Sequence, residues 1–363
     1  MYGGAGSHLS MKASEPSERV SLGRLGELGL IRRIRSSVAG PAPDVVVGIG
    51  DDAAVLSVPA GHQLLATTDL VIEDVHFRRA SATPADIGWK ALAVNLSDIA
   101  AMGGTPRWAL VALAVPADTA VESIDAFYAG MESAAAPHRV TLVGGDTSAS
   151  PGGWFVNVTL LGIHAGTPRL RSHARPGDAV AVTGSLGASA AGLYALEMGL
   201  DEARARGIAP GELAEITQAH LRPQARVSEG RWLGQAPGVH AMMDCSDGLA
   251  TDLGHICRES GLGARVRLDR VPISPVVLEA ARALGQDVRQ WAVRGGEDYE
   301  LLLTCDPAAA GALATGLAEA TGTRLTVVGQ IEARSGDVVF VGADDVPVTI
   351  RAGYEHFTGS ERG

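Results

Sequence analysis

Residues 84–104 of the chain read PADIGWKALAVNLSDIAAMGG. Proline at the start and two glycines at the end are typical helix boundaries, so the stretch predicts a helix from Pro84 to about Met102. Between these ends the residues are apolar almost all round, which indicates a helix buried against other elements. Asn95 and Asp98 share one face of this helix. A buried carboxylate needs a partner, and for Asp98 the scarcity of lysine implies an arginine or a metal ion.

Helix-like and strand-like segments flank this helix on both sides. Leucine or isoleucine at every third residue predicts a first helix from Leu22 to about Val38. The predicted strands are Val45–Ile49, Ala54–Val58, Gln63–Thr68, Trp108–Val115, Val140–Val143, Trp154–His164, Ala179–Thr183, Val239–Met243, Ala264–Leu268, Tyr299–Thr304 and Thr326–Ile331. The other predicted helices are Val121–Ala136, Ala188–Glu197, Gln224–Leu233 and Gly248–Glu259. Many successive strands have no helix between them, so we expect a mixed α/β (α+β) fold with antiparallel pairs.

A stretch rich in Gly, Pro, Arg and Ser, GTPRLRSHARPG at 166–177, interrupts the pattern. A length of 363 residues favours two domains, and we place the boundary in this stretch. The predicted division is a disordered N-terminal lead (1–20), an N-terminal domain (21–166) and a C-terminal α/β domain (167–363).

The composition narrows the classes of partner. Hydrophobic residues make up 46% and charged residues 20% of the chain, which is typical of a globular protein. The formal net charge of −11 argues against a nucleic-acid or anionic-membrane partner. Lysine occurs only at Lys12 and Lys90, so any phosphate chemistry must depend on arginine, backbone N–H groups or divalent cations. No apolar run has the length of a membrane helix, and three scattered cysteines fit a reducing cytoplasm.

Acidic residues recur beside Gly, Ser or Thr, mostly at expected strand ends or turns. These residues are Asp51 and Asp52, Asp69, Asp98, Asp146, Asp244 and Asp247, and Glu297 and Asp298. Each alone is open to a simpler interpretation as a turn residue or a helix cap, as for Asp247 before the helix that follows it. Taken together, they predict one site. Oxygen ligands without His or Cys favour Mg²⁺, Mn²⁺ or Ca²⁺ over zinc, and carboxylates from distant segments suit metal-assisted phosphoryl transfer.

Other phosphate-binding signals are weak. No lysine stands in a Walker A context, and the glycine-rich stretch 184–192 is either a tight turn or a phosphate-facing loop. Arg171 is either a phosphate ligand or a solvated charge.

Seven motifs stand in the order seen in the thiamine-monophosphate kinase family. They are GIGDDAAVL (48–56), ATTDLVIEDVHF (66–77), KALAVNLSDIAAMGGTP (90–106), LVGGDTS (142–148), MDCSDGLATDLGHI (243–256), GGEDYELLLT (295–304) and GYEHF (353–357). The chain therefore resembles this family, which belongs to the aminoimidazole ribonucleotide synthetase-like ATP-binding superfamily. The resemblance runs from about Leu22 to Phe357 and is specific as a set.

The resemblance implies ATP-dependent phosphorylation of thiamine monophosphate to thiamine diphosphate, by direct transfer without a catalytic base. It also implies a two-domain fold whose N-terminal domain binds magnesium and ATP, with its sheet joining that of a second copy in a homodimer. The implied Mg²⁺ ligands are Asp52, Thr67, Thr68, Asp69, Asp98, Asp146, Asp244 and Asp247. The implied ATP contacts are Gly145, Asp146, Arg171 and Ser246, and the implied substrate contacts are His76, Glu297 and Tyr354.

Two alternatives of different kinds stay open. One is another ATP-using member of the superfamily, such as aminoimidazole ribonucleotide synthetase. The other is a non-catalytic nucleotide-binding regulator with the same fold, although the full set of carboxylates argues against it.

Overall fold

Two β-sheets organise the chain, with the longest helix between them. The computed structural model describes residues 21–37, 42–49, 53–334, 336 and 338–350. The predicted lead at 1–20, and the predicted site residues Asp52 and Tyr354, lie outside the described residues. The mixed α/β fold predicted from the sequence is confirmed.

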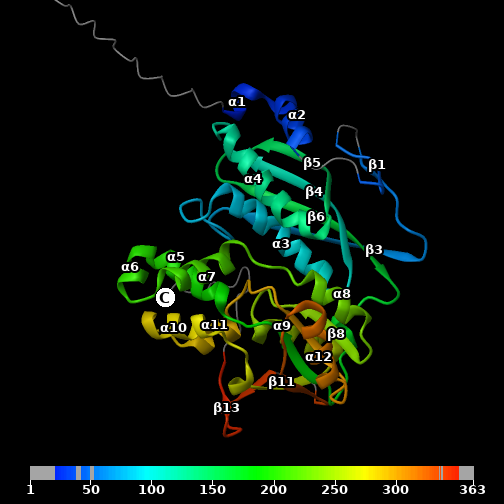
Figure 1. Cartoon of the computed structure of the whole chain (residues 1–363), viewed down its shortest axis with the longest axis vertical. Helices are drawn as coiled ribbons and strands as arrows, with labels where there is room; N and C mark the ends of the chain where they lie inside the picture. The colour runs from blue at the N-terminus through cyan, green and yellow to red at the C-terminus, as the bar shows by residue number, and fades with distance from the viewer. Residues whose placement is uncertain (1–20, 38–41, 50–52, 335, 337, 351–363) are drawn as a thin grey trace, which may run out of the picture.

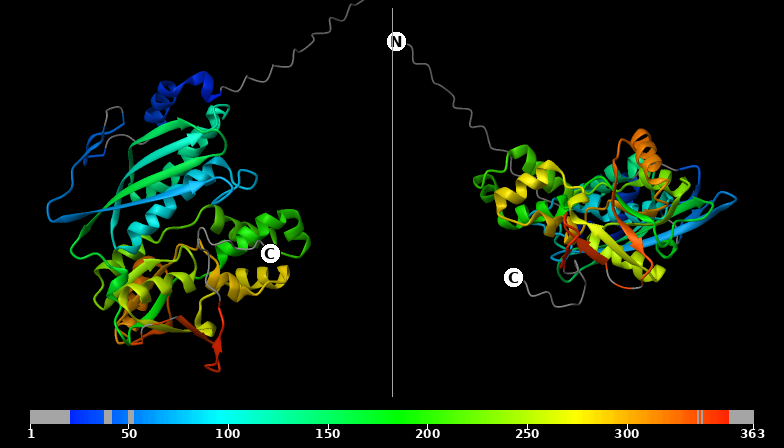
Figure 2. Two further views of the ribbon diagram at one scale, coloured as in Figure 1. Left: turned by 180° about the vertical axis from the view of Figure 1, so that it is seen from behind. Right: turned by 90° about the horizontal axis from the view of Figure 1, so that it is seen from below.

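The N-terminal sheet has four strands in the order β3-β6-β4-β5 (Figure 1). Its strands are β3 (His62–Ile72), β4 (Thr105–Val115), β5 (Thr141–Ala149) and β6 (Phe155–Ala165). β6 is antiparallel to both β3 and β4, whereas β4 and β5 are parallel. Helices α3 (Pro84–Ala101) and α4 (Val121–Ala135) cover one face. The left view of Figure 2 looks onto the opposite face, where none of the described helices lies over the strands.

Helix α3 begins and ends as its sequence predicts. Thr83 caps its N-terminus in a reciprocal capping box with Asp86, and Pro84 occupies the first turn. Gly88 allows the close approach of α4, because a Cβ there would stand 1.9 Å from the carbonyl oxygen of Phe127. The helix is buried along most of its length and contacts both sheets. It therefore links the two halves of the molecule.

The C-terminal sheet has seven strands in the order β13-β12-β9-β11-β7-β10-β8. These are β7 (Ala179–Thr183), β8 (Val239–Asp244), β9 (Gly263–Arg267), β10 (Leu301–Cys305), β11 (Leu325–Glu332), β12 (Val338–Val341) and β13 (Pro347–Val348). The helices of this half are α5 (Ala188–Met198), α6 (Leu200–Ala205), α7 (Pro210–Leu221), α8 (Val227–Gln235), α9 (Leu249–Ser260), α10 (Pro275–Leu284), α11 (Val288–Arg294) and α12 (Ala310–Thr321). Short 3₁₀ turns are η1 (Ala136–His138), η2 (Arg171–His173) and η3 (Leu268–Arg270).

The structure corrects the predicted first helix. Two helices, α1 (Leu22–Leu25) and α2 (Glu27–Ser37), replace the single one, because Gly26 at φ 72° leaves the helical conformation between them. The short pair β1 (Val45–Val47) and β2 (Val55–Leu56) follows.

Strands β3 and β5 are longer than predicted. Both continue past their apolar runs, because pairing with β6 and β4 holds their polar ends in the sheet. Asp69 and Asp146 therefore lie inside strands rather than after them, and the alternation of the strand decides which face each side chain occupies.

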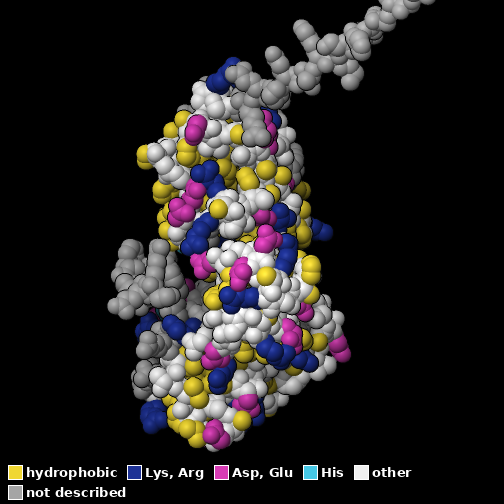
Figure 3. Space-filling view, turned by 90° about the vertical axis from the view of Figure 1, so that its left-hand side faces the viewer, with side chains coloured by type: hydrophobic (Ala, Val, Ile, Leu, Met, Phe, Trp, Pro, Cys, Tyr) yellow, Lys and Arg dark blue, Asp and Glu magenta, His cyan; other side chains and the backbone are white. Residues whose placement is uncertain are grey.

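The surface adds two observations. None of the described helices is both long enough and apolar enough to cross a bilayer. On the face shown in Figure 3, Lys and Arg side chains are interspersed with Asp and Glu among the described residues.

Candidate functional site

Three aspartates from distant segments meet on the covered side of the N-terminal sheet. Thr67 and Asp69 point from β3 toward α3, as the alternating burial along the strand indicates. The Thr67 hydroxyl donates a hydrogen bond to Asp98 of α3, and the carboxyl groups of Asp69 and Asp98 are hydrogen-bonded to each other. Asp244, at the end of β8, completes the group, which we call the inner acidic cluster (Asp69, Asp98 and Asp244).

The pKa shifts of these carboxylates indicate that they share one environment. Burial and the charges of Asp98 and Asp244 raise the pKa of Asp69 to about 7. Burial and the charge of Asp98 raise the pKa of Asp244 to about 6, although the Ser97 hydroxyl donates to it over 2.7 Å. Like charges held together in a low-dielectric site disfavour ionisation of them all. The cluster therefore has a deficit of positive charge.

The loop from β8 to α9 brings further polar groups to the cluster. Its member Asp247 does not cap α9, because Gly248 takes the N-cap position. The Asp247 amide instead donates to Asp252 over 3.2 Å. Asp252 was missed in the sequence: it is fully buried, its Oδ1 has no partner among the described residues, and burial with Asp244 and Asp247 raises its pKa to about 8. Ser246 is half-buried, and its carbonyl accepts from the Glu297 amide at 2.8 Å.

Arg171 supplies positive charge to this region. It lies exposed in η2, and its charge acts to lower the pKa values of Asp98, Asp244 and Asp252. A guanidinium whose charge acts on a carboxylate cluster is suited to binding an anion held near that cluster.

A second polar group surrounds Glu297, one of the predicted substrate contacts. Both of its carboxylate oxygens lie 2.9 Å from Nζ of Lys90, and its Oε2 lies 3.2 Å from Nδ1 of His220. Lys90 also donates to the carbonyl of His76 over 3.2 Å. Burial acts to raise the pKa of Glu297, but the charge and the hydrogen bond of Lys90 outweigh it, so the pKa lies below its usual range. We call Lys90, His220 and Glu297 the interdomain triplet.

The histidines of this region are neutral donors and acceptors. Burial and the nearby Lys90 charge lower the pKa of His220 to about 4. Ser189 contacts the same Nδ1 of His220, at 3.0 Å, that contacts Glu297. A Ser-His-acid catalytic triad uses both ring nitrogens, so this arrangement is not one. Nδ1 of His76 accepts from the Ile72 amide at 3.1 Å, which places the proton of the neutral ring on Nε2.

The remaining predicted ligands lie on the other face of the sheet. Thr68 is exposed there and bonds Asn157 and Thr159 of β6. Asp146 of β5 is exposed and pairs in register with Ala112 of β4. Because β3 and β5 are the two edge strands, one chain does not bring Asp146 to the inner acidic cluster.

Gly145, beside Asp146, is required by packing. Its φ is +155°, and a Cβ would stand 1.9 Å from the carbonyl oxygen of Val111 on the neighbouring strand. Glycine therefore lets β5 pair closely with β4 immediately before Asp146.

The donor set fits magnesium. Carboxylate and hydroxyl oxygens are the ligands that this hard cation prefers. As the side chains stand, no group of three or more His, Cys, Asp or Glu in the described chain could hold a metal ion. Magnesium commonly takes one or two protein carboxylates and completes its shell with water and substrate phosphates, so the inner acidic cluster suits it without a closed cage.

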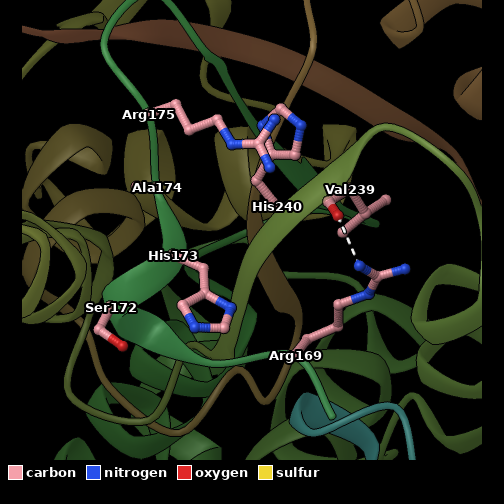
Figure 4. Close-up of a pocket in the computed structure, with 7 residues that line it drawn as sticks. All are labelled: Arg169, Ser172, His173, Ala174, Arg175, Val239 and His240. Carbon is pink, nitrogen blue, oxygen red and sulfur yellow. Dashed lines mark hydrogen bonds between the residues drawn. The ribbon is translucent and has the colours of Figure 1, made fainter. Parts of the chain in front are cut away.

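One pocket of the described chain lies elsewhere, at the start of β8. It has a volume of about 410 Å³ and is lined by Arg169, Ser172, His173, Ala174, Arg175, Val239 and His240 (Figure 4). Arg169 donates to the carbonyls of Gly234, Ala236 and Val239, and His240 contacts Asp178 at 2.9 Å. Its most buried polar groups therefore already have partners within the chain.

Comparison with known proteins places this geometry among relatives. Residues 50–164 match the model of the AIR synthase related protein, N-terminal domain, and residues 175–342 match that of the C-terminal domain. The chain is 40% identical to thiamine-monophosphate kinase of Salmonella typhimurium over 92% of this chain and 98% of that one. It is 38% identical to thiamine-monophosphate kinase of Bacillus subtilis over 86% of this chain and 94% of that one.

The similar solved structures include members of the same family as the sequence relatives. Thiamine-monophosphate kinase from Stenotrophomonas maltophilia K279a superposes with a TM-score of 0.75 at 37% identity, covering 86% of this chain and 95% of that chain. AaThiL complexed with AMPPCP and TMP superposes with a TM-score of 0.71 at 32% identity, covering 96% and 100%. HypE of E. coli has a TM-score of 0.72 at 20% identity over 91% and 98% of the chains, which shows the shared fold alone.

Proposed function

Because the chain belongs to the thiamine-monophosphate kinase family, we propose that it phosphorylates thiamine monophosphate with ATP, giving ADP and thiamine diphosphate. A phosphate oxygen of thiamine monophosphate would form a bond to the γ-phosphorus of ATP while the bond from that phosphorus to the β-phosphate oxygen breaks. The acceptor oxygen is already ionised, so no residue need act as a general base, and we assign none.

The observation that carries the proposal is the meeting of Asp69, Asp98 and Asp244 within reach of the positive charge of Arg171. Three segments far apart in sequence build one site with a deficit of positive charge. A polyphosphate is itself anionic, so it approaches such carboxylates only when cations lie between them. Phosphoryl transfer fits this site better than binding of an uncharged ligand does.

We assign the inner acidic cluster, with Thr67 and Asp247, to holding Mg²⁺, together with Asp52 outside the described residues. When bound, magnesium neutralises charge on the transferring phosphoryl group. Arg171 would bind the ATP phosphates, and Ser246 would contact the nucleotide from the β8–α9 loop. Thr68 would serve as a metal ligand, Gly145 as an ATP contact and Asp146 as both, all through the second copy described below.

We assign Glu297 and His76 to the substrate's heterocycles, with Tyr354 as an aromatic contact outside the described residues. A carboxylate suits a cationic or amino-bearing ring, and Nε2–H of His76 suits an acceptor. The boundary at 166/167 would place Asp69 and Asp98 in one half and Asp244, Asp247 and Glu297 in the other, so both halves would contribute to the site. The free, buried cysteines Cys245, Cys257 and Cys305 are compatible with a cytoplasmic enzyme.

We further propose that two copies join their N-terminal sheets. On the outer face, Leu64 is 51% exposed, Leu70 is 49% exposed and Phe155 is 38% exposed. Large apolar side chains grouped on one exposed face are typical of a surface that a partner covers. Pairing of the edge strands β5 and β3 with β3 and β5 of a second copy, with the outer faces of the two sheets turned toward each other, would cover this face. It would also set Asp146 beside Thr68 of the partner subunit, on the same side of the joined sheet.

Purified protein incubated with ATP, Mg²⁺ and thiamine monophosphate tests the reaction, with products separated by chromatography. We expect ADP and thiamine diphosphate in equal amounts. ADP without thiamine diphosphate would point to another ATP-using member of the superfamily. ATP binding without turnover would point to a nucleotide-binding regulator.

A further inference from the structure

Helix α3 does not need a lysine at position 90 for its own stability. Its side chain is 4% exposed, on the apolar helix α3, yet it ends in an ammonium group that bonds both oxygens of Glu297. Burying an ion pair is commonly neutral or unfavourable compared with apolar residues of the same volume. Stability alone therefore does not account for a lysine here.

The pair fixes a carboxylate that the chain already holds in a restricted conformation. Glu297 has φ 66°, a region that residues with a side chain rarely adopt. Its amide donates to Ser246, and the next residue, Asp298, accepts from the amides of Gly187 and Ser189 at the start of α5. Backbone and side chain of Glu297 are thus both held, the side chain from α3 and α7.

The same face of α3 holds a carboxylate of the inner acidic cluster. Ser97 donates to Asp244 over 2.7 Å, and Lys90 lies seven positions earlier, two turns along the helix. A rise of 1.5 Å per residue separates the two anchor points by about 10 Å. One rigid, buried helix therefore sets the spacing between the phosphate end of the site and Glu297.

We propose that Lys90 is a positioning residue for substrate recognition: through its ion pair it holds Glu297 at a set distance from the inner acidic cluster. The substrate class this selects is a phosphate monoester whose cationic or amino-bearing heterocycle lies about two helical turns from its phosphate. This inference rests on the proposed kinase function and adds a residue that none of the motif assignments gave a role.

Steady-state kinetics of Lys90→Met tests the proposal. Methionine preserves the buried stem and removes the ammonium group. We expect the KM for thiamine monophosphate to rise at least about tenfold, the loss typical of one hydrogen bond to a charged group. The KM for ATP should stay within about twofold, because the inner acidic cluster keeps its geometry. Titration of thiamine monophosphate without ATP should show the same loss of affinity by calorimetry.

A double-mutant cycle separates positioning from a general structural effect. In a Glu297→Gln background, Lys90→Met should have little further effect on that KM, because the residue it positions is already altered. Lys90→Arg should recover part of the lost affinity. Arg222→Ala breaks the Asp86–Arg222 pair (2.5 Å), another link between α3 and the C-terminal half, and serves as the matched control with an unchanged KM.

The outcomes distinguish failure of the positioning role of Lys90 from failure of the proposed kinase function. If the wild-type protein forms no thiamine diphosphate, the proposed function fails. If it does, and Lys90→Met keeps the wild-type KM for thiamine monophosphate, the positioning role is overturned. Equal rises in both KM values, or an additive double mutant, would also overturn it in favour of a purely structural lysine.

Discussion

The two faces of the N-terminal sheet treat neighbouring residues of one strand in opposite ways. On the inner face, Thr67 and Asp69 are shielded by α3 and bonded to Asp98. On the outer face, the partners of Thr68 among the described residues lie within the sheet, and Leu70 beside it is 49% exposed. The inner face builds its half of the site within one chain, whereas the outer face leaves apolar area and two predicted ligands in solvent.

The difference between the two faces explains why the predicted ligands fall into two groups, one on each face of the sheet. The inner acidic cluster needs a counter-charge, and the outer face needs a covering surface. A divalent cation would supply the counter-charge, and a second copy of the chain would supply the covering surface. Each can be tested by a change confined to one face.

The largest expected effect is on the inner face. Asp98→Asn removes a charged metal ligand but preserves the shape of the side chain, so we expect kcat to fall by about a thousandfold. The fold should persist, because the amide relieves the repulsion from Asp69 and Asp244. Kinetics and circular dichroism of the same sample measure both quantities.

Asp118→Asn is the matched control, since it makes the same chemical change at an exposed position between β4 and α4. Its kcat should equal that of the wild type. Wild-type turnover in Asp98→Asn would show that the helix carboxylate is structural and that the inner face is not the catalytic side.

Helix α3 was predictable because it depends on local signals. The proline and the glycines mark the ends of α3, and its apolar surface indicates burial. The ends of β3 and β5 were not predictable from apolar runs, because Asp69 and Asp146 are polar residues kept in strands by their neighbours. Hydrogen-bonded pairing with neighbouring strands decides where these strands end, and those neighbours lie far away in the sequence.

The contacts between side chains of the site could not be predicted from local sequence signals. Lys90 and Glu297 are 207 positions apart, and nothing in either motif names the other. The scarcity of lysine was a usable clue, since one of two lysines on an apolar helix requires an anion. Asp252 gave no such clue: an acid in the first turn of a helix is ordinary, and only the fold shows that it is buried beside Asp244.

The second prediction concerns the outer face. Leu64→Glu places a charge on the apolar surface that we propose is covered by a second copy, so self-association should weaken by about a hundredfold. Sedimentation velocity measures the dimer fraction across protein concentrations. Activity should fall with the dimer fraction, because Asp146 would no longer meet its partner site.

Leu278→Glu is the control for that change, because Leu278 is 42% exposed on α10, away from the N-terminal sheet. It should leave association and activity unaltered. A wild-type protein that sediments as a monomer, or an unaffected Leu64→Glu dimer, would contradict the joined-sheet arrangement while leaving the inner face untouched.

The smallest expected effect is the pH dependence of the inner face. The pKa of Asp69, about 7, lies above its ordinary value of 3.8, so without metal the folded state binds more protons than the unfolded state between these values. Its contribution to stability is therefore present at low pH and is lost as the pH rises toward 7. Magnesium competes with the same proton, and its affinity should rise about tenfold between pH 6 and pH 8. Calorimetric titration at the two pH values measures this, and Asp69→Asn should weaken binding and flatten the pH dependence. An affinity independent of pH in the wild type would mean that Mg²⁺ does not displace the shared proton, and the deficit of positive charge would no longer separate the inner face from the outer one.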